Sequence, residues 1–240
     1  IVEKESLGGV CLNWGCIPTK ALLKSAQVFE YIQHAEDFGI NVKDADADFG
    51  SVVKRSRGIA DGMSKGIDFL MKKNKIEVII GTAKVKAGKK VDVVDADGKT
   101  TEYSASNIII ATGARSRELP NLPQDGKKII GYRKAMTLDK KPSKVVVVGS
   151  GAIGVEFAYF YNAMDVDVTL VEYMPNIVPV EDEDISKQLA RSFKKSGIKV
   201  MTNTSVESVD TSGKKCLVSV KTKKGEETIE CDVVLSAVGI

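Results

Sequence analysis

The sequence has little histidine, tryptophan or cysteine, and it lacks both a basic tract and a long apolar run. It holds one histidine, one tryptophan and four cysteines in 240 residues. A zinc site needs a second cysteine pair or histidines beside the first pair, so the composition argues against a metal. The 32 acidic and 35 basic residues are scattered, and no basic tract favours nucleic acid. No apolar run could span a bilayer, and no signal-peptide pattern opens the chain. We therefore expect neither nucleic acid nor membrane as a partner, and a cytoplasmic or organelle-matrix location.

The length allows one large or two ordinary domains, and the 43% hydrophobic and 28% charged residues are typical of a soluble globular protein. The chain opens without methionine at residues 1–4, which resemble the end of a strand, and it stops directly after a strand at residues 238–240. These ends predict an interior fragment.

Two cysteines near the N-terminus are the strongest sign of function. Cys11 and Cys16 are close enough in sequence to close a small disulfide ring, in a glycine-rich segment. Pro18 fits the first turn of a helix through residues 21–29, and the helix dipole and Lys20 would both favour a thiolate at Cys16. The alternative is a buried or zinc-binding cysteine pair, which usually has a different spacing and further ligands.

Helical spacing of apolar residues predicts a second helix over about residues 49–73, followed by strands at 77–85 and 90–94. Residues 107–113 have the sequence of a buried strand. A proline-bearing segment between Pro120 and Pro142 marks a connection between two domains, so we expect the first domain to end near residue 117.

The second half opens with a nucleotide-binding pattern. A buried strand at 144–148 runs into Gly149-Ser150-Gly151-Ala152-Ile153-Gly154 and a helix, and a strand at 166–171 ends in Glu172. In this context the pattern is the dinucleotide-binding βαβ fingerprint, and the acid favours NAD over NADP because it repels a 2′-phosphate. A glycine-rich turn that binds nothing is the alternative. A helix at 182–195, further strands and a last strand at 232–239 follow.

The motif that ends in Cys16-Ile17-Pro18-Thr19-Lys20 resembles the redox-active disulfide of the flavin disulfide reductases, and most of all that of the dihydrolipoamide dehydrogenases. The similarity covers essentially all 240 residues. It implies an α/β fold of two Rossmann-like dinucleotide-binding domains: a truncated FAD domain with the redox disulfide at 1–117 and an NAD domain at 118–240. The returning part of the FAD domain and the dimer-interface domain would lie outside the chain.

The resemblance also implies roles for single residues. Cys11 would exchange disulfides with the substrate and Cys16 would face the flavin, while Lys20 would form an ion pair with Glu156 beside it. The alternative for Lys20 and Glu156 is an ordinary surface pair. The implied FAD contacts are Glu3, Lys4, Gly8, Gly9, Val10, Lys20, Ala83, Thr112 and Gly113. The implied NAD contacts are Gly149, Gly151, Ala152, Ile153, Gly154, Glu172, Val206 and Gly239.

The implied reaction is oxidation of dihydrolipoamide, on a lipoyl carrier domain, by NAD through the disulfide and FAD. Such enzymes are homodimers that serve as the third component of 2-oxoacid dehydrogenase complexes, and their acid/base histidine lies outside this chain. His34 is expected to be a solvated helix residue, and Cys216 and Cys231 to be reduced structural residues. The other interpretations are a relative similar to glutathione or mercuric reductase, and a noncatalytic NAD-binding module. The fragment alone would be inactive.

Overall fold

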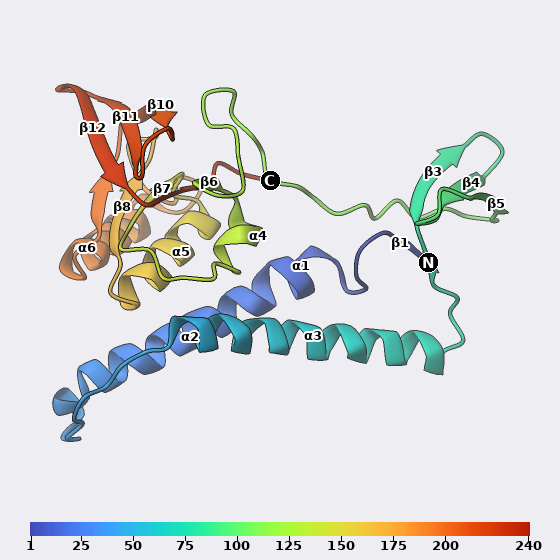
Figure 1. The fold of residues 1–240 in the computed structure, drawn as a ribbon, viewed down its shortest axis with the longest axis horizontal. Helices are drawn as coiled ribbons and strands as arrows, with labels where there is room; N and C mark the ends of the chain where they lie inside the picture. Colours follow the sequence, from blue (N-terminus) through green and yellow to red (C-terminus); the bar gives the residue numbers. More distant parts are fainter. The chain divides into compact units, whose positions relative to one another are not determined.

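The computed structural model describes all residues from Ile1 to Ile240, and these form two compact units (Figure 1). The first unit consists of residues 1–18 and 57–114, and the second of residues 19–56 and 115–240. Two long helices, α2 (Cys16–Gln33) and α3 (Phe49–Lys73), each begin in one unit and end in the other. Helix α3 has the bounds that the apolar spacing predicts.

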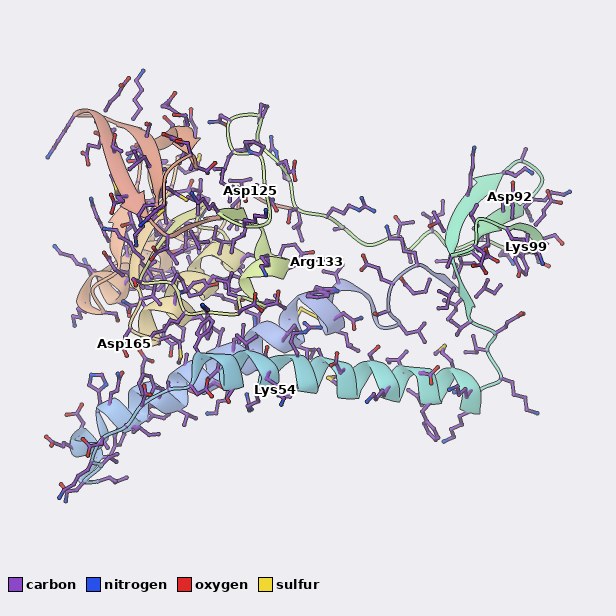
Figure 2. The ribbon with its side chains drawn as sticks, in the orientation of Figure 1. Lys54, Asp92, Lys99, Asp125, Arg133 and Asp165 are labelled. Carbon is purple, nitrogen blue, oxygen red and sulfur yellow. A yellow bond between two sulfur atoms is a disulfide. The ribbon has the colours of Figure 1, made fainter.

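The first unit combines helices with two small sheets. Strand β1 (Val2–Glu3) pairs in parallel with β2 (Ile79–Ile80), and helix α1 (Gly9–Trp14) precedes α2. Strands β3 (Thr82–Lys86), β4 (Lys90–Val94) and β5 (Thr100–Ser104) form an antiparallel sheet. Ion pairs join neighbouring strands of this sheet. For example, the carboxylate of Asp92, which is labelled in Figure 2, lies 3.1 Å from Nζ of Lys86.

The predicted buried strand at 107–113 is wrong for this structure. The segment is irregular, and Ile109 and Ile110 are 90% and 71% exposed. A strand of this apolar type requires hydrogen-bonded neighbours and cover on both faces. The only parallel pairing in the unit joins the two-residue strands β1 and β2, and residues 107–113 pair with neither of them.

A parallel sheet forms the centre of the second unit. Its strand order is β6 (Ile129–Ile130), β13 (Val233–Ser236), β7 (Lys144–Val148), β8 (Asp167–Val171) and β9 (Lys199–Met201). Val145, Val146 and Val147 of the central strand are fully buried. Three helices connect these strands, α4 (Tyr132–Ala135), α5 (Ala152–Ala163) and α6 (Glu183–Lys195). This βαβ arrangement confirms the predicted α/β, Rossmann-like fold.

A separate antiparallel sheet of three strands carries the two remaining cysteines. It comprises β10 (Ser205–Asp210), β11 (Cys216–Thr222) and β12 (Gly225–Cys231). Cys216 and Cys231 face each other across β11 and β12, and both are buried free thiols, as predicted. Burial raises the pKa of both thiols, that of Cys231 to about 12, so they remain protonated and unreactive.

Aromatic packing holds the start of α3 against α5 within the second unit. The Phe49 ring lies 6.0 Å from the Phe160 ring and 6.5 Å from the Tyr161 ring. The Tyr161 hydroxyl is buried and donates to the carbonyl of Ala135 at 2.9 Å. A short 3-10 helix, η1 (Ala35–Phe38), follows α2. His34, just before it, is exposed as predicted, with Nδ1 2.9 Å from the carbonyl oxygen of Glu30.

Candidate functional site

Residues 149–151 form the turn between β7 and α5, which we call the glycine turn. This turn has the geometry that a bound pyrophosphate requires. Gly149 has φ +96°, and a Cβ there would lie 2.5 Å from the carbonyl oxygen of Ala237. A Cβ on Gly154 would lie 1.9 Å from the carbonyl oxygen of Gly149, so glycine is required for helix and strand to pack. A Cβ on Gly151 would meet nothing within 4 Å. The fingerprint therefore combines two tightly packed glycines with one that faces open space.

The same turn exposes the first backbone N–H groups of α5. Gly151 is the residue before the helix, and no side chain caps it. Ala152 and Ile153 follow, so their N–H groups lie in the first turn, where a helix has no internal acceptors and attracts anions. The open space at Gly151 and these free donors fit the pyrophosphate of a dinucleotide.

Glu172 follows β8 and is held in place by three donors. Its Oε2 accepts hydrogen bonds from the N–H of Ser150 at 2.8 Å and from the Ser150 hydroxyl at 2.5 Å, and its Oε1 accepts from the N–H of Met174 at 2.8 Å. The Glu172 residue is only 7% exposed. The structure thus brings the predicted ribose-binding acid against the glycine turn. Sequence analysis missed Ser150, because its place inside the fingerprint does not show which group its hydroxyl contacts.

Two predicted NAD contacts lie on neighbouring segments of the same unit. Val206 is in β10, where the register with β11 shifts, and its carbonyl oxygen accepts from Asn121 Nδ2 at 2.5 Å. Gly239 has φ +115°, and its carbonyl oxygen accepts from the N–H of Arg117 at 2.9 Å. Neither contact involves the glycine turn.

The predicted ion pair between α2 and α5 is present. Lys20 Nζ lies 2.5 Å from Glu156 Oε1, with the two side chains 63% and 26% exposed. A second link joins the same helices, because the Tyr159 hydroxyl donates to the Glu30 carboxylate. Partial burial and this carboxylate raise the pKa of Tyr159, so its hydroxyl remains a donor at ordinary pH.

Cys11 and Cys16 form a disulfide, with their Cα atoms 4.7 Å apart. Cys11 lies within α1, and Cys16 is the first residue of α2. Asn13 helps to hold α1, because its side-chain amide donates to the carbonyls of Leu7 and Gly9. The Arg57 guanidinium donates to the carbonyl of Asn13 and lies 4.2 Å from the centre of the Trp14 ring. These contacts support the pair and were not predicted.

The predicted FAD contacts of the first unit are only partly brought together. Gly8 and Gly9 have positive φ, and Gly9 faces open space. Gly113 also has positive φ, and a Cβ there would lie 3.5 Å from the Val10 side chain. The carboxylate of Glu3 accepts from the N–H groups of Lys4 and Glu5.

Ala83 and Thr112 are the two other predicted FAD contacts of this unit. Ala83 lies in β3 opposite Val93, and Thr112 lies in the irregular exposed segment. No described hydrogen bond or ion pair joins either residue to the others. The bare backbone at Gly9 still fits a close approach by a phosphate or sugar.

The described residues contain no cluster of three histidine, cysteine or acidic side chains that could hold a metal. None of the helices has both the length and the apolar character needed to cross a membrane.

The disulfide, the glycine turn and the acid after β8 agree with the comparison to protein families. The model of the pyridine nucleotide-disulphide oxidoreductases matches residues 1–240. The chain belongs to this family. FAD and NAD are the cofactors of such oxidoreductases, as predicted for this chain.

Several curated proteins are similar to the chain over its whole length. Dihydrolipoyl dehydrogenases from Chlorobaculum tepidum and Rhizobium etli are 44% and 43% identical to it over 100% of its length. The match covers 51% and 53% of those two proteins, so the chain spans about half the length of the curated relatives it matches.

Two solved structures have the same fold over nearly the whole chain. LpdA from Mycobacterium tuberculosis matches 99% of the chain and 52% of its own, with a TM-score of 0.90 and 27% identity. The flavoprotein disulfide reductase RclA from Escherichia coli matches 99% of the chain and 50% of its own, with a TM-score of 0.83 and 25% identity.

Proposed function

We propose that the full-length protein is a dihydrolipoyl dehydrogenase, which oxidises dihydrolipoamide to lipoamide with NAD. The observation that supports this most is the Cys11–Cys16 disulfide at the start of a helix, in a chain 43% to 45% identical to proteins of that name. Because the chain spans about half of those relatives, activity, substrate and partners are proposed for the full-length protein.

The disulfide would be the first electron acceptor. A thiolate of dihydrolipoamide attacks Cys11, the S–S bond to Cys16 breaks, and Cys16 leaves as a thiolate at the start of α2. The second substrate thiol then displaces Cys11, so lipoamide forms with the loss of two electrons and two protons. The helix N-terminus stabilises the Cys16 thiolate.

FAD, when bound, carries the two electrons from the dithiol to NAD, which takes up a hydride while one proton is released to solvent. Lys20 follows Cys16 by one helical turn, and Glu156 holds its ammonium in one orientation. A fixed cation would stabilise negative charge that develops beside it during electron transfer. Lys20 and Glu156 are therefore proposed as positioned catalytic groups, together with Cys11 and Cys16.

The residues of the glycine turn would bind NAD. Gly149, Gly151 and Gly154 allow the pyrophosphate to approach the N–H groups of Ala152 and Ile153, and Glu172 accepts from the adenosine ribose. Val206 and Gly239 would line the same nucleotide. On the FAD side, Glu3, Lys4, Gly8, Gly9, Val10, Ala83, Thr112 and Gly113 stay proposed contacts.

The proposal extends to organisation and partners. The FAD domain would comprise residues 1–117 and the NAD domain residues 118–240, in a homodimer that serves a 2-oxoacid dehydrogenase complex and receives a lipoyl carrier domain. The free thiols of Cys216 and Cys231, which face each other unbridged, favour a reducing compartment such as the bacterial cytoplasm or an organelle matrix.

The test uses the full-length protein, purified with its flavin. NADH formation from NAD is followed by absorbance with dihydrolipoamide as the reductant. Cys11→Ser and Cys16→Ser should each lower kcat at least about a thousandfold, as expected when a covalent nucleophile is lost. Cys216→Ser is the matched control and should retain activity.

Other results would contradict the proposal. Turnover of glutathione disulfide or mercuric ion with no turnover of dihydrolipoamide would replace it with a related reductase. A full-length protein that contains no flavin would leave only a noncatalytic NAD-binding module. Residues 1–240 expressed alone are expected to be inactive, since the exposed segment around Ile109 and Ile110 forms no part of a sheet.

A further inference from the structure

Ser150 is a buried residue of the glycine turn that has no role in the proposed chemistry. It is 0% exposed, although the flanking Gly149 and Gly151 belong to a nucleotide-binding turn. Both of its hydrogen-bond donors reach the same atom, because its N–H and its hydroxyl donate to Oε2 of Glu172 at 2.8 and 2.5 Å. The Ser150 side chain therefore binds Glu172 and has no contact with solvent.

These bonds leave little acceptor capacity on the carboxylate of Glu172. A carboxylate has about four lone-pair positions. Ser150 fills two on Oε2, and the N–H of Met174 fills one on Oε1 at 2.8 Å. One position on Oε1 remains for a ligand. All three donors are neutral groups, so the negative charge of Glu172 is held in place but not neutralised.

The backbones on both sides of this contact are also anchored. The carbonyl of Ser150 accepts from the N–H of Val178 at 3.0 Å. Glu172 donates its N–H to Met201 at 2.8 Å, and its carbonyl accepts from Thr204 at 2.9 Å. With both backbones held, rotation of the Glu172 side chain is the remaining way for the carboxylate to move, and the Ser150 hydroxyl opposes that rotation.

We propose that Ser150 is a positioning residue that sets the choice between NAD and NADP. The hydroxyl holds the Glu172 carboxylate so that one oxygen accepts an adenosine ribose hydroxyl, while the charge cannot turn away from a 2′-phosphate. Selectivity is a difference between two affinities, and an acid that cannot move lowers only the affinity for the phosphorylated nucleotide. This inference rests on the proposed function only in so far as the turn binds a pyridine nucleotide.

The test measures equilibrium binding and not turnover. The dissociation constants of NAD and NADP are measured by calorimetry on the full-length oxidised protein. Ser150→Ala should weaken NAD binding by roughly tenfold, because the released Glu172 side chain must then be ordered when the ribose binds. NADP should bind as tightly as before or more tightly. The ratio of the NADP dissociation constant to the NAD dissociation constant should therefore fall by roughly tenfold or more. Glu172→Gln, which removes the charge, should lower this ratio of dissociation constants further.

Two variants control for folding. Ser186→Ala removes another buried serine hydroxyl, which lies 3.4 Å from the carbonyl oxygen of Val178, and should leave the NAD to NADP ratio unchanged. Ser150→Gly removes the same hydroxyl with a smaller residue, and it carries the test if the alanine variant does not fold.

The possible outcomes are distinguishable. If Ser150→Ala weakens NAD and NADP by the same factor, the serine is merely structural and the inference is overturned. The same conclusion follows if Ser150→Ala changes neither dissociation constant. A wild-type protein that binds neither nucleotide would overturn the proposed function, and this inference with it.

Discussion

Two segments of the chain have nearly the same sequence character and different structures. Residues 107–113 and residues 232–239 are both apolar runs that end in a glycine. The second contains β13, which pairs with β6 and β7, and Val234 and Leu235 are fully buried. The first is irregular, with Ile109 90% exposed. A buried strand therefore forms only where neighbouring strands supply its hydrogen bonds and cover its faces.

The largest expected effect tests this difference directly. Val147→Asp would place a charge in the centre of the parallel sheet, where the side chain is fully buried between β8 and β13. We expect a loss of more than about 4 kcal/mol in the free energy of unfolding, enough to unfold the second unit. Ile109→Asp in the 240-residue chain should change it by less than about 0.5 kcal/mol, because the side chain is already in solvent.

Denaturant unfolding of both variants, followed by circular dichroism, checks this pair. A large destabilisation by Ile109→Asp would mean that residues 107–113 are packed in solution, and the comparison between the two segments would fail.

The glycine turn allows a smaller and sharper comparison. Gly154→Ala would force a Cβ to within 1.9 Å of the Gly149 carbonyl oxygen, whereas Gly151→Ala would add one to open space. We expect Gly154→Ala to destabilise the protein by about 2 kcal/mol or more, as overpacking does. Gly151→Ala should leave the melting temperature nearly unchanged and weaken NAD binding. Calorimetric melting and NAD titration separate the two effects, and equal melting temperatures would contradict the packing argument.

The buried thiol of Cys231 should make the stability of the second unit depend on pH, whereas the disulfide cysteines do not titrate. Burial raises the pKa of Cys231 from 9.0 to about 12, so in this interval the unfolded chain loses a proton that the folded protein keeps. Stability should therefore fall as pH rises from about 9 to about 12. Lysines and tyrosines titrate in the same range, so the readout is the difference between wild type and Cys231→Ala, whose stability should fall less steeply. Parallel curves for the two proteins would argue against a protonated, buried thiol.

The elements with strong local signals are those that the sequence predicts well. The helical spacing of apolar residues in α3 indicates a helix with one buried face. The continuous run of valines in β7 indicates a strand that is buried on both faces. The strand β5, Thr100–Ser104, was missed because its exposed, polar residues show no pattern and only pairing with β4 makes it a strand. Helix α1 was missed because its flanking glycines indicate a loop.

The candidate site shows the same division. The spacing of Cys11 and Cys16 and the βαβ fingerprint are local, so the sequence predicts them. The three donors to Glu172 come from a turn and from a segment after β8, and only the fold brings them together. Sequence analysis therefore identified the acid and missed Ser150, which holds it.

The smallest expected effect on stability concerns two lysines in similar ion pairs. Lys20 lies 2.5 Å from Glu156 in the second unit, and Lys72 lies 2.6 Å from Asp68 in the first, with lysine side chains 63% and 75% exposed. Exposed pairs contribute about 0 to 1 kcal/mol, so Lys20→Gln and Lys72→Gln should each change the free energy of unfolding by less than about 1 kcal/mol. Activity should separate them. If the Lys20 ammonium stabilises charge during electron transfer, Lys20→Gln in the full-length protein should lower kcat by roughly tenfold to a hundredfold. Lys72→Gln should leave kcat unchanged, and equal activities would reduce Lys20 to an ordinary surface residue.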